Sequence, residues 1–174
     1  MKNLLLIAII VLGFSGVSFG QASFTGTATS SATIITPISL VKTSDMNFGN
    51  IAVNATTGGT VVLVPAGTRI GTAGVTVSGV LAGTITAATF TVNGANNQAY
   101  SITLPTGNHT IKRATGTEVM QVNSFTSDPS GSTGVLSATG AQTLHIGATL
   151  NVSGGQLPGV YTSAVGFDVT VNYN

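Results

Sequence analysis

The chain has 174 residues, of which only nine are charged: five Lys or Arg and four Asp or Glu. Charged residues usually make up about a quarter of a soluble domain, and here they make up 5%. This composition excludes a basic nucleic-acid-binding protein, a coiled coil and a highly charged disordered chain. It also argues against an enzyme, because few titratable groups are present. The length suits one domain with a short tail.

Residues 1–20 have the order of a secretory signal peptide. A short basic start is followed by an apolar run, residues 4–14, and then by mostly small residues, 15–20. The apolar run is about half the roughly 20 residues that a spanning helix needs, so we expect cleavage, after Gly20 or alternatively after Ala22. The protein is therefore predicted to be exported through the general secretory pathway and to be secreted or displayed at the cell surface, with no membrane span left after cleavage.

Removal of residues 1–20 also removes Lys2, which leaves four basic and four acidic residues. A chain without net charge has little long-range self-repulsion, and this favours association. The chain has no Cys, so the predicted secreted domain must be stabilised by its core rather than by disulfides.

The N-terminal segment, residues 21–36, differs from the rest of the chain. From Ala22 to Ile34, small or apolar residues alternate strictly with Ser and Thr, and this period is typical of one long strand. The apolar positions with candidate assembly roles are Phe24, Ala28, Ala32 and Ile34. Two interpretations stay open: an ordinary first strand of the domain, or a donor strand that completes the sheet of a neighbouring subunit.

The remaining residues, 37–174, predict a domain built from strands and turns. The β-branched residues Thr (28) and Val (19) are abundant, and such residues favour strands. Alternation predicts strands over 143–152 and 161–173, with a shorter one around Tyr100, Ile102 and Leu104, and Val61 to Val64 suggests a central strand. Near residues 84–92 the period slips, which predicts a β-bulge at Ala87-Ala88.

Gly-rich and Pro-rich turn signals separate these runs, and no segment has a sustained helical period. Many short strands of this kind indicate an antiparallel sandwich or a barrel. An outer-membrane barrel would require two girdles of aromatic residues. The eight aromatic residues after residue 20 fall mostly on strand faces that also hold aliphatic residues, so we interpret them as core.

Several motifs resemble the domain-of-unknown-function 4402 family. They are the runs 32–40 and 45–51, the segments 59–63, 100–105 and 125–129, and the ending 158–161 with its closing strand to residue 173. The second run contains Asn47-Phe48-Gly49, and the ending contains Gly159-Val160-Tyr161. The Asn-Phe-Gly and Gly-x-Tyr elements are also similar to those of spore-coat-U-like and chaperone–usher pilin domains. The resemblance implies a small secreted bacterial protein with an immunoglobulin-like antiparallel β-sandwich and a structural role at the cell surface. Asn47, Phe48, Gly49, Gly159 and Tyr161 are then expected to be structural residues.

No candidate catalytic group is suggested by the sequence. His109 and His145 are 36 positions apart, and the four carboxylates are scattered, whereas a metal site or a carboxylate pair needs convergent groups. No Gly-x-Ser-x-Gly elbow occurs, and no phosphate-binding loop. We therefore expect no catalytic residue, no metal and no cofactor.

These observations predict a non-enzymatic, pilin-like or fimbrial-like surface subunit. Its expected partner is a second copy of itself or another surface subunit, and not a nucleic acid. The alternative is a monomeric secreted module that binds a ligand or a carbohydrate, which would need an exposed aromatic cleft.

Overall fold

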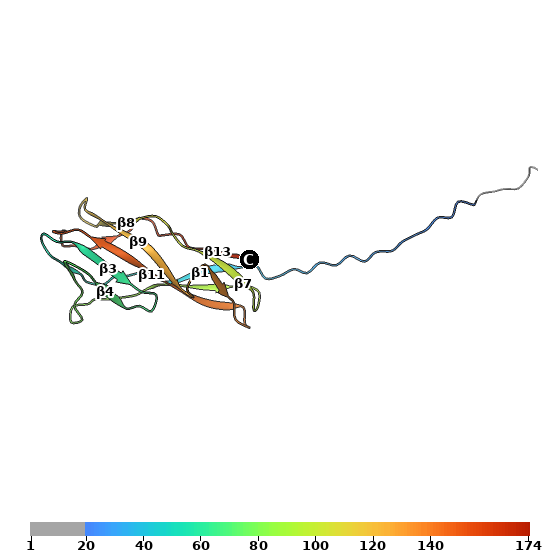
Figure 1. The fold of residues 1–174 in the computed structure, drawn as a ribbon, viewed down its shortest axis with the longest axis horizontal. Coiled ribbons are helices and arrows are strands. Elements are labelled where there is room, and N and C mark those ends of the chain that lie inside the picture. The colour runs from blue at the N-terminus through green and yellow to red at the C-terminus, as the bar shows by residue number, and fades with distance from the viewer. Residues whose placement is uncertain (1–19) are drawn as a thin grey trace, which may run out of the picture. The chain divides into compact units, whose positions relative to one another are not determined.

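The computed structural model describes residues 20–174 (Figure 1). The signal peptide predicted for residues 1–20 therefore lies, except for Gly20, outside the described residues. Residues Ile35–Asn174 form one compact unit, and residues 20–34 do not belong to it. Residues 20–174 contain thirteen strands and no helix, so none of these residues forms a helix that could cross a membrane.

Every strand pair is antiparallel. The largest sheet has the strand order β1 (Ser39–Ser44), β6 (Ala88–Asn93), β11 (Ala141–Val152), β9 (Val119–Asp128), β8 (His109–Arg113) and β12 (Tyr161–Thr162). Two more strands belong to this sheet: β3 (Gly59–Leu63) pairs with β11, and β4 (Arg69–Gly71) pairs with β3. A second sheet has the order β10 (Thr133–Val135), β7 (Ala99–Thr103) and β13 (Thr170–Tyr173). Two further strands, β2 (Ala52–Val53) and β5 (Val75–Thr76), pair with each other.

Two groups of buried side chains fill the space between the sheets. The Tyr100 cluster joins β6 and β11 of the largest sheet to β7 of the second sheet, and consists of Ala88, Val92, Tyr100, Ile102, Leu136, Leu144 and Ile146. The Phe48 cluster joins β3, β9 and β11 to β5, and consists of Phe48, Val61, Leu63, Val75, Val122, Ala148, Leu150 and Val152. The sheets therefore pack face to face, and the all-β antiparallel sandwich predicted from the sequence is confirmed.

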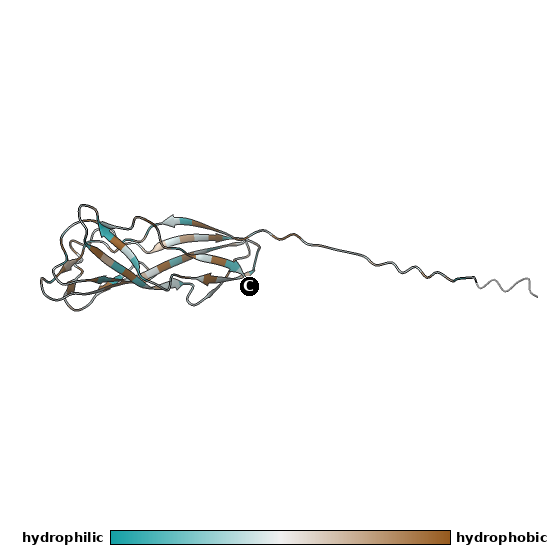
Figure 2. Ribbon diagram, turned by 90° about the horizontal axis from the view of Figure 1, so that it is seen from above, coloured by the Kyte–Doolittle hydropathy of each residue, from teal (hydrophilic) through white to brown (hydrophobic). Residues whose placement is uncertain are grey.

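Strand β11 is the central element of the sandwich. Figure 1 shows it crossing the domain beside β9, and Figure 2 shows apolar and polar bands alternating along the strands. Leu144 and Ile146 lie in the Tyr100 cluster, whereas Ala148, Leu150 and Val152 lie in the Phe48 cluster. The strand predicted over 143–152 is confirmed, and one strand connects both parts of the core.

Two sequence predictions of strand geometry are wrong. The strand expected over 161–173 is divided into β12 and β13. Val165, which the alternation places on the same face as Phe167 and Val169, is 76% exposed. The bulge expected at Ala87-Ala88 is also absent, because β6 begins at Ala88 and pairs regularly with β11. The register shift lies instead on the partner strand β1, between Lys42 and Ser44. Ala87 and Ala88 are both buried. The apolar pattern of the sequence therefore slips here because two consecutive residues pack in the interior, and not because β6 contains an extra residue.

Candidate assembly surface

The arm, which we define as residues 21–34, contains no strand, and all its side chains are exposed. Phe24 and Ile34 are 95% and 97% exposed, and Ala28 and Ala32 are exposed too. The arm has no charged residue. Its alternating residues have the pattern of a strand, while the structure provides no ladder partner for its backbone within residues 20–174.

The second sheet ends at β13, and the register identifies which of its backbone groups point outward. On β7, Ile102 N donates to Ser132 O at 2.8 Å, on the β10 side. Val171 lies opposite Ile102, and backbone groups along an antiparallel ladder point alternately to one side and to the other. The N–H and C=O of Val171 therefore point away from β7. Among residues 20–174 no strand pairs with this outer edge.

Apolar side chains along this edge are only half-buried. Val169 and Val171 pack against the Tyr100 cluster from β13 and the residue before it, and Leu40 packs against the same cluster from β1. Strands β1 and β13 are in contact. Because β1 and β13 are each the last strand of their sheet, this rim of the sandwich leaves core-facing apolar groups partly uncovered.

Tyr173 connects β13 to the start of the compact unit. Its hydroxyl donates to Thr36 O at 2.7 Å and accepts a hydrogen bond from Ala95 N at 2.6 Å. The side chain is half-buried and packs against the Tyr100 cluster. Sequence reasoning placed Tyr173 on the inward face but missed this link between the two ends of the domain, because no local pattern pairs residues 137 positions apart.

The segment between β12 and β13 leaves an open pocket. Residues 161–162 pair with residues 112–113 of β8, and residues 170–173 pair with residues 100–103 of β7. The residues between these two paired stretches, 163–169, belong to no strand. The cavity there has a volume of about 460 Å³ and is lined by residues 103–109 with residues 166–168 and 170. Phe167 packs beside it, with its ring centroid 5.8 Å from that of His109 and 4.9 Å from that of Phe125.

Asn47, Phe48 and Gly49 form a backbone turn at one end of the sandwich. The side-chain Oδ1 of Asn47 accepts a hydrogen bond from Gly49 N at 2.8 Å, while its backbone bridges to Thr86. Phe48 is buried in the Phe48 cluster. Gly49 has φ +68°, and a Cβ there would collide with Ala82 O and approach Arg69 Nη1 to 2.8 Å.

Arg69 fastens this turn to the neighbouring loop. Its guanidinium donates to Phe48 O and to Ala82 O, and desolvation lowers its pKa from the ordinary value. The guanidinium lies among backbone carbonyls, so it caps a turn and is not placed to bind an anion. Sequence reasoning did not identify Arg69, since nothing near it in sequence indicates its partners.

Gly159 and Tyr161 form a second structural corner. The hydroxyl of Tyr161 donates to Leu157 O at 2.7 Å and accepts from Gln156 Nε2 at 3.0 Å. Arg113 Nε donates to Pro158 O at 2.8 Å, and a Cβ on Gly159 would lie 2.7 Å from that nitrogen. A tyrosine that binds the backbone just before its own strand is typical of immunoglobulin-like sandwiches. The two motifs occupy different parts of the sandwich, one bridged to Thr86 and one paired to β8.

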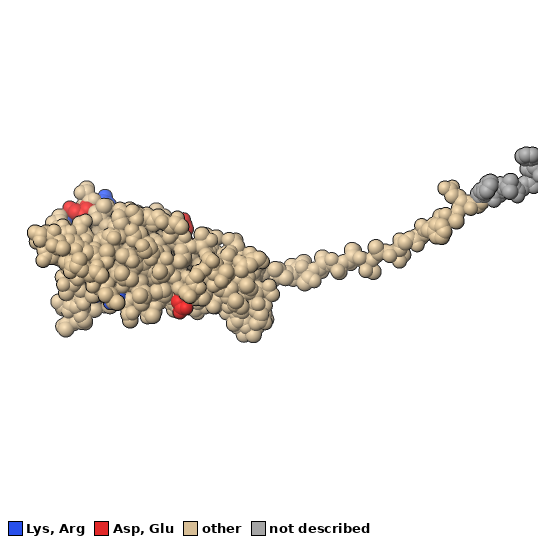
Figure 3. Space-filling view, viewed as in Figure 1, with Lys and Arg blue, Asp and Glu red and all other residues tan. Residues whose placement is uncertain are grey.

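The titratable side chains are dispersed. Asp45 pairs with Lys42 at 2.6 Å and Glu118 with Arg113 at 3.5 Å, and Figure 3 shows mostly uncharged surface. His145 Nδ1 lies 3.3 Å from Thr89 Oγ1, whereas His109 packs on Phe167. Residues 20–174 contain no group of three or more His, Cys, Asp and Glu side chains that could hold a metal ion.

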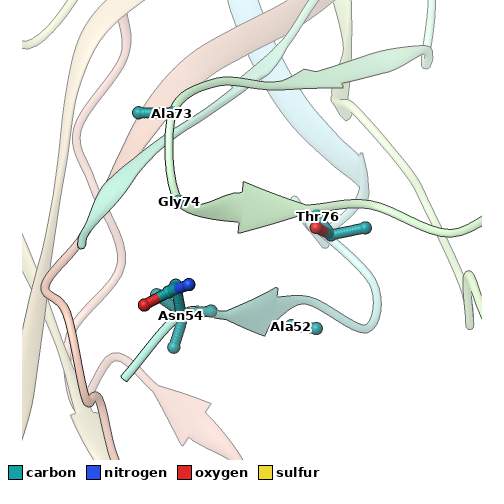
Figure 4. A pocket seen from close by; sticks show the side chains of 6 residues that line it. Ala52, Asn54, Ala73, Gly74 and Thr76 are labelled. Carbon is teal, nitrogen blue, oxygen red and sulfur yellow. The ribbon is translucent and has the colours of Figure 1, made fainter. Parts of the chain in front are cut away.

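The three tyrosines and the second pocket offer little for sugar recognition. Tyr100 is fully buried with its hydroxyl bonded to Gln142, and Tyr161 and Tyr173 are half-buried. The pocket between β2 and β5 (Figure 4) has a volume of about 340 Å³ and is lined mainly by small side chains. Its one amide, Asn54, already accepts hydrogen bonds from the backbone and hydroxyl of Thr56.

Comparison with known proteins agrees with the motifs. The family model described as Domain of unknown function (DUF4402) matches residues 38–173, a range that contains both the Asn47-Phe48-Gly49 turn and the Tyr161 corner. No match to a curated protein or to a solved structure was found. The matched residues span nearly the whole sandwich, and the chain belongs to the DUF4402 family.

Proposed function

We propose that the protein is a non-enzymatic, pilin-like structural subunit, exported to the bacterial surface, in which the arm of one copy adds as a strand to another copy. The observation that supports this proposal is the arm itself. It has the alternating pattern of a strand, no charge and no ladder partner within residues 20–174. Strand addition of this kind is a known mode of recognition, in which main-chain hydrogen bonds give affinity and alternate side chains give specificity.

The energetics require apolar burial as well as hydrogen bonds. Ordering a backbone residue costs about 1–2 kcal/mol, and one intramolecular hydrogen bond contributes only about 0.5–1.5 kcal/mol net. Backbone pairing alone therefore falls short of the free-energy cost of ordering the arm. Burial of a large apolar side chain adds about 1.5–3 kcal/mol, so Phe24 and Ile34, both almost fully exposed here, are the expected sources of stability.

The direct test is the size distribution of the mature protein and of a variant lacking residues 21–34, by unheated gel electrophoresis and electron microscopy. We expect a ladder or filaments from the complete chain and monomers from the variant. The deletion removes no buried residue, so the unfolding temperature of the variant should match that of the monomeric wild-type domain. Monomers from both proteins would contradict the proposal and favour the alternative of a ligand-binding module.

A further inference from the structure

Among the edges of the sandwich, the outer edge of β13 is the one best suited to accept a strand. Strand β1 carries Lys42 and a register shift between Lys42 and Ser44, and charges and bulges are features that protect edges from pairing. Strand β4 begins with Arg69, whose side chain caps the Asn47 turn. Strand β10, the other edge of the second sheet, has only three residues and includes Gly134. Strands β2, β5 and β12 have only two residues each. Residues 169–173, in contrast, contain no charged residue, no Pro and no Gly.

We propose that the outer edge of β13 accepts the arm of a second copy of this chain. This inference rests on the proposed function and names its acceptor site. The N–H and C=O of Val171, which point away from β7, pair with the backbone of the arm. Both partners are uncharged, so no charge is desolvated when the strand is added.

The alternation of both segments fixes which faces meet. On β13, Thr170 and Asn172 are exposed, while Val169 and Val171 face the Tyr100 cluster. In two paired strands, the side chains of residues that lie directly opposite each other point to the same side of the sheet. The hydroxyl positions of the arm, such as Thr27, therefore lie on the side of Thr170, and its small apolar positions, such as Ala28, lie over the half-buried rim. Small residues suit this position because β1 and β13 are in contact there.

The first test separates donor from acceptor. Proline at position 171 removes an outward N–H without breaking a bond to β7, so Val171→Pro with an intact arm is a donor that cannot accept. The chain lacking residues 21–34 is an acceptor that cannot donate. We expect each to be monomeric alone and the 1:1 mixture to form a dimer that does not extend, measured by size-exclusion chromatography with light scattering.

The outcomes distinguish the acceptor from the proposed function. If Val171→Pro assembles like the wild type, or if the mixture stays monomeric while the wild type assembles, the β13 edge is not the acceptor. If the complete wild-type chain does not assemble, the proposed function itself is overturned.

A second test does not depend on the folding of the proline variant. The chain has no Cys, so introduced pairs report contacts without background. The acceptor lacking residues 21–34 receives Thr170→Cys, and the donor receives one Cys in the arm. Disulfides need Cα atoms about 4.4–6.8 Å apart, so we expect cross-links at one or two of the positions 25, 27, 29 and 31, and few at the matched positions 26, 28, 30 and 32. Equal yields from both sets, or none in the assembled protein, would overturn the inference.

Discussion

Single residues fix the turns at which the sandwich strands begin. Gly49 adopts φ +68° against the backbone of Ala82, and the side chain of Asn47 closes the turn in front of it. Arg69 then holds the carbonyls of Phe48 and Ala82. The side-chain oxygen of Asn47 and the carbonyl of Phe48 are both hydrogen-bonded within this turn and its neighbours, as expected for a structural element.

We predict that Gly49→Ala destabilises the domain by about 1–3 kcal/mol, because the variant combines a left-handed backbone with a collision. Urea denaturation measures this. Gly79→Ala is the matched control, because nothing lies within 4 Å of the position that its Cβ would take, and it should change stability by less than about 0.5 kcal/mol. Equal effects of the two substitutions would show that the turn is not under this constraint.

The phenol of Tyr100 is expected to make the domain less stable as the pH rises in the alkaline range. Burial raises the pKa of its phenol above the ordinary value of 10.0, so the folded state holds the proton more tightly than the unfolded chain does. The resulting stabilisation is complete below pH 10 and is lost as the pH rises through the folded-state pKa. We expect the free energy of unfolding to fall more steeply above pH 10 in the wild type than in Tyr100→Phe. Parallel slopes in urea denaturation across this range would contradict the assignment.

At the scale of elements, the sequence predicted strands well where one face is continuously buried. Leu144, Ile146, Ala148, Leu150 and Val152 are all buried, as their spacing indicates. The Val61–Val64 run gave a central strand, with Val61 and Leu63 buried and Val62 and Val64 half-buried. A period of two is informative over 144–152 because every second side chain of this part of β11 lies in the core.

Prediction failed where a strand passes from one sheet to the other. Over 161–173 the alternation is continuous, but the chain pairs first with β8 and then with β7, so its middle has no ladder and Val165 is exposed. The edge position of β13 and the Arg69 cap were not predictable either, because both depend on pairing between residues distant in sequence. Membership of the family and the structural positions of Phe48 and Gly49 were readable from local motifs.

The sequence of the arm has the periodicity of a strand, but the arm pairs with no strand among residues 20–174. We predict that Phe24→Ala weakens assembly roughly 10- to 150-fold, which corresponds to the about 1.5–3 kcal/mol gained by burying a large apolar side chain. The concentration dependence of assembly, measured by light scattering, checks this. Leu81→Ala is the matched control, because Leu81 is also exposed but lies outside the arm. Similar losses in both variants would indicate nonspecific apolar association.

At the scale of the whole molecule, the composition suits repeated association. The chain after residue 20 has four basic and four acidic residues, and Figure 3 shows few of them on the face that it presents. Subunits of this kind have little electrostatic repulsion to overcome when they join. If the arm of one copy pairs with the β13 edge of another, as proposed, the contact is heterologous, and such a contact generates open filaments when the rotation between copies does not close.

Hydrogen exchange of the arm amides in the assembled protein tests the central claim most directly. In the monomer, residues 22–34 should exchange freely. In the assembled protein, the alternate amides that point at β13, within the stretch of the arm that pairs with it, should become as slow as those of β7. Pairing with a ladder is the physical cause, because hydrogen-bonded strand amides exchange only when the structure opens. An assembled protein whose arm amides still exchange at the monomer rate would contradict strand donation.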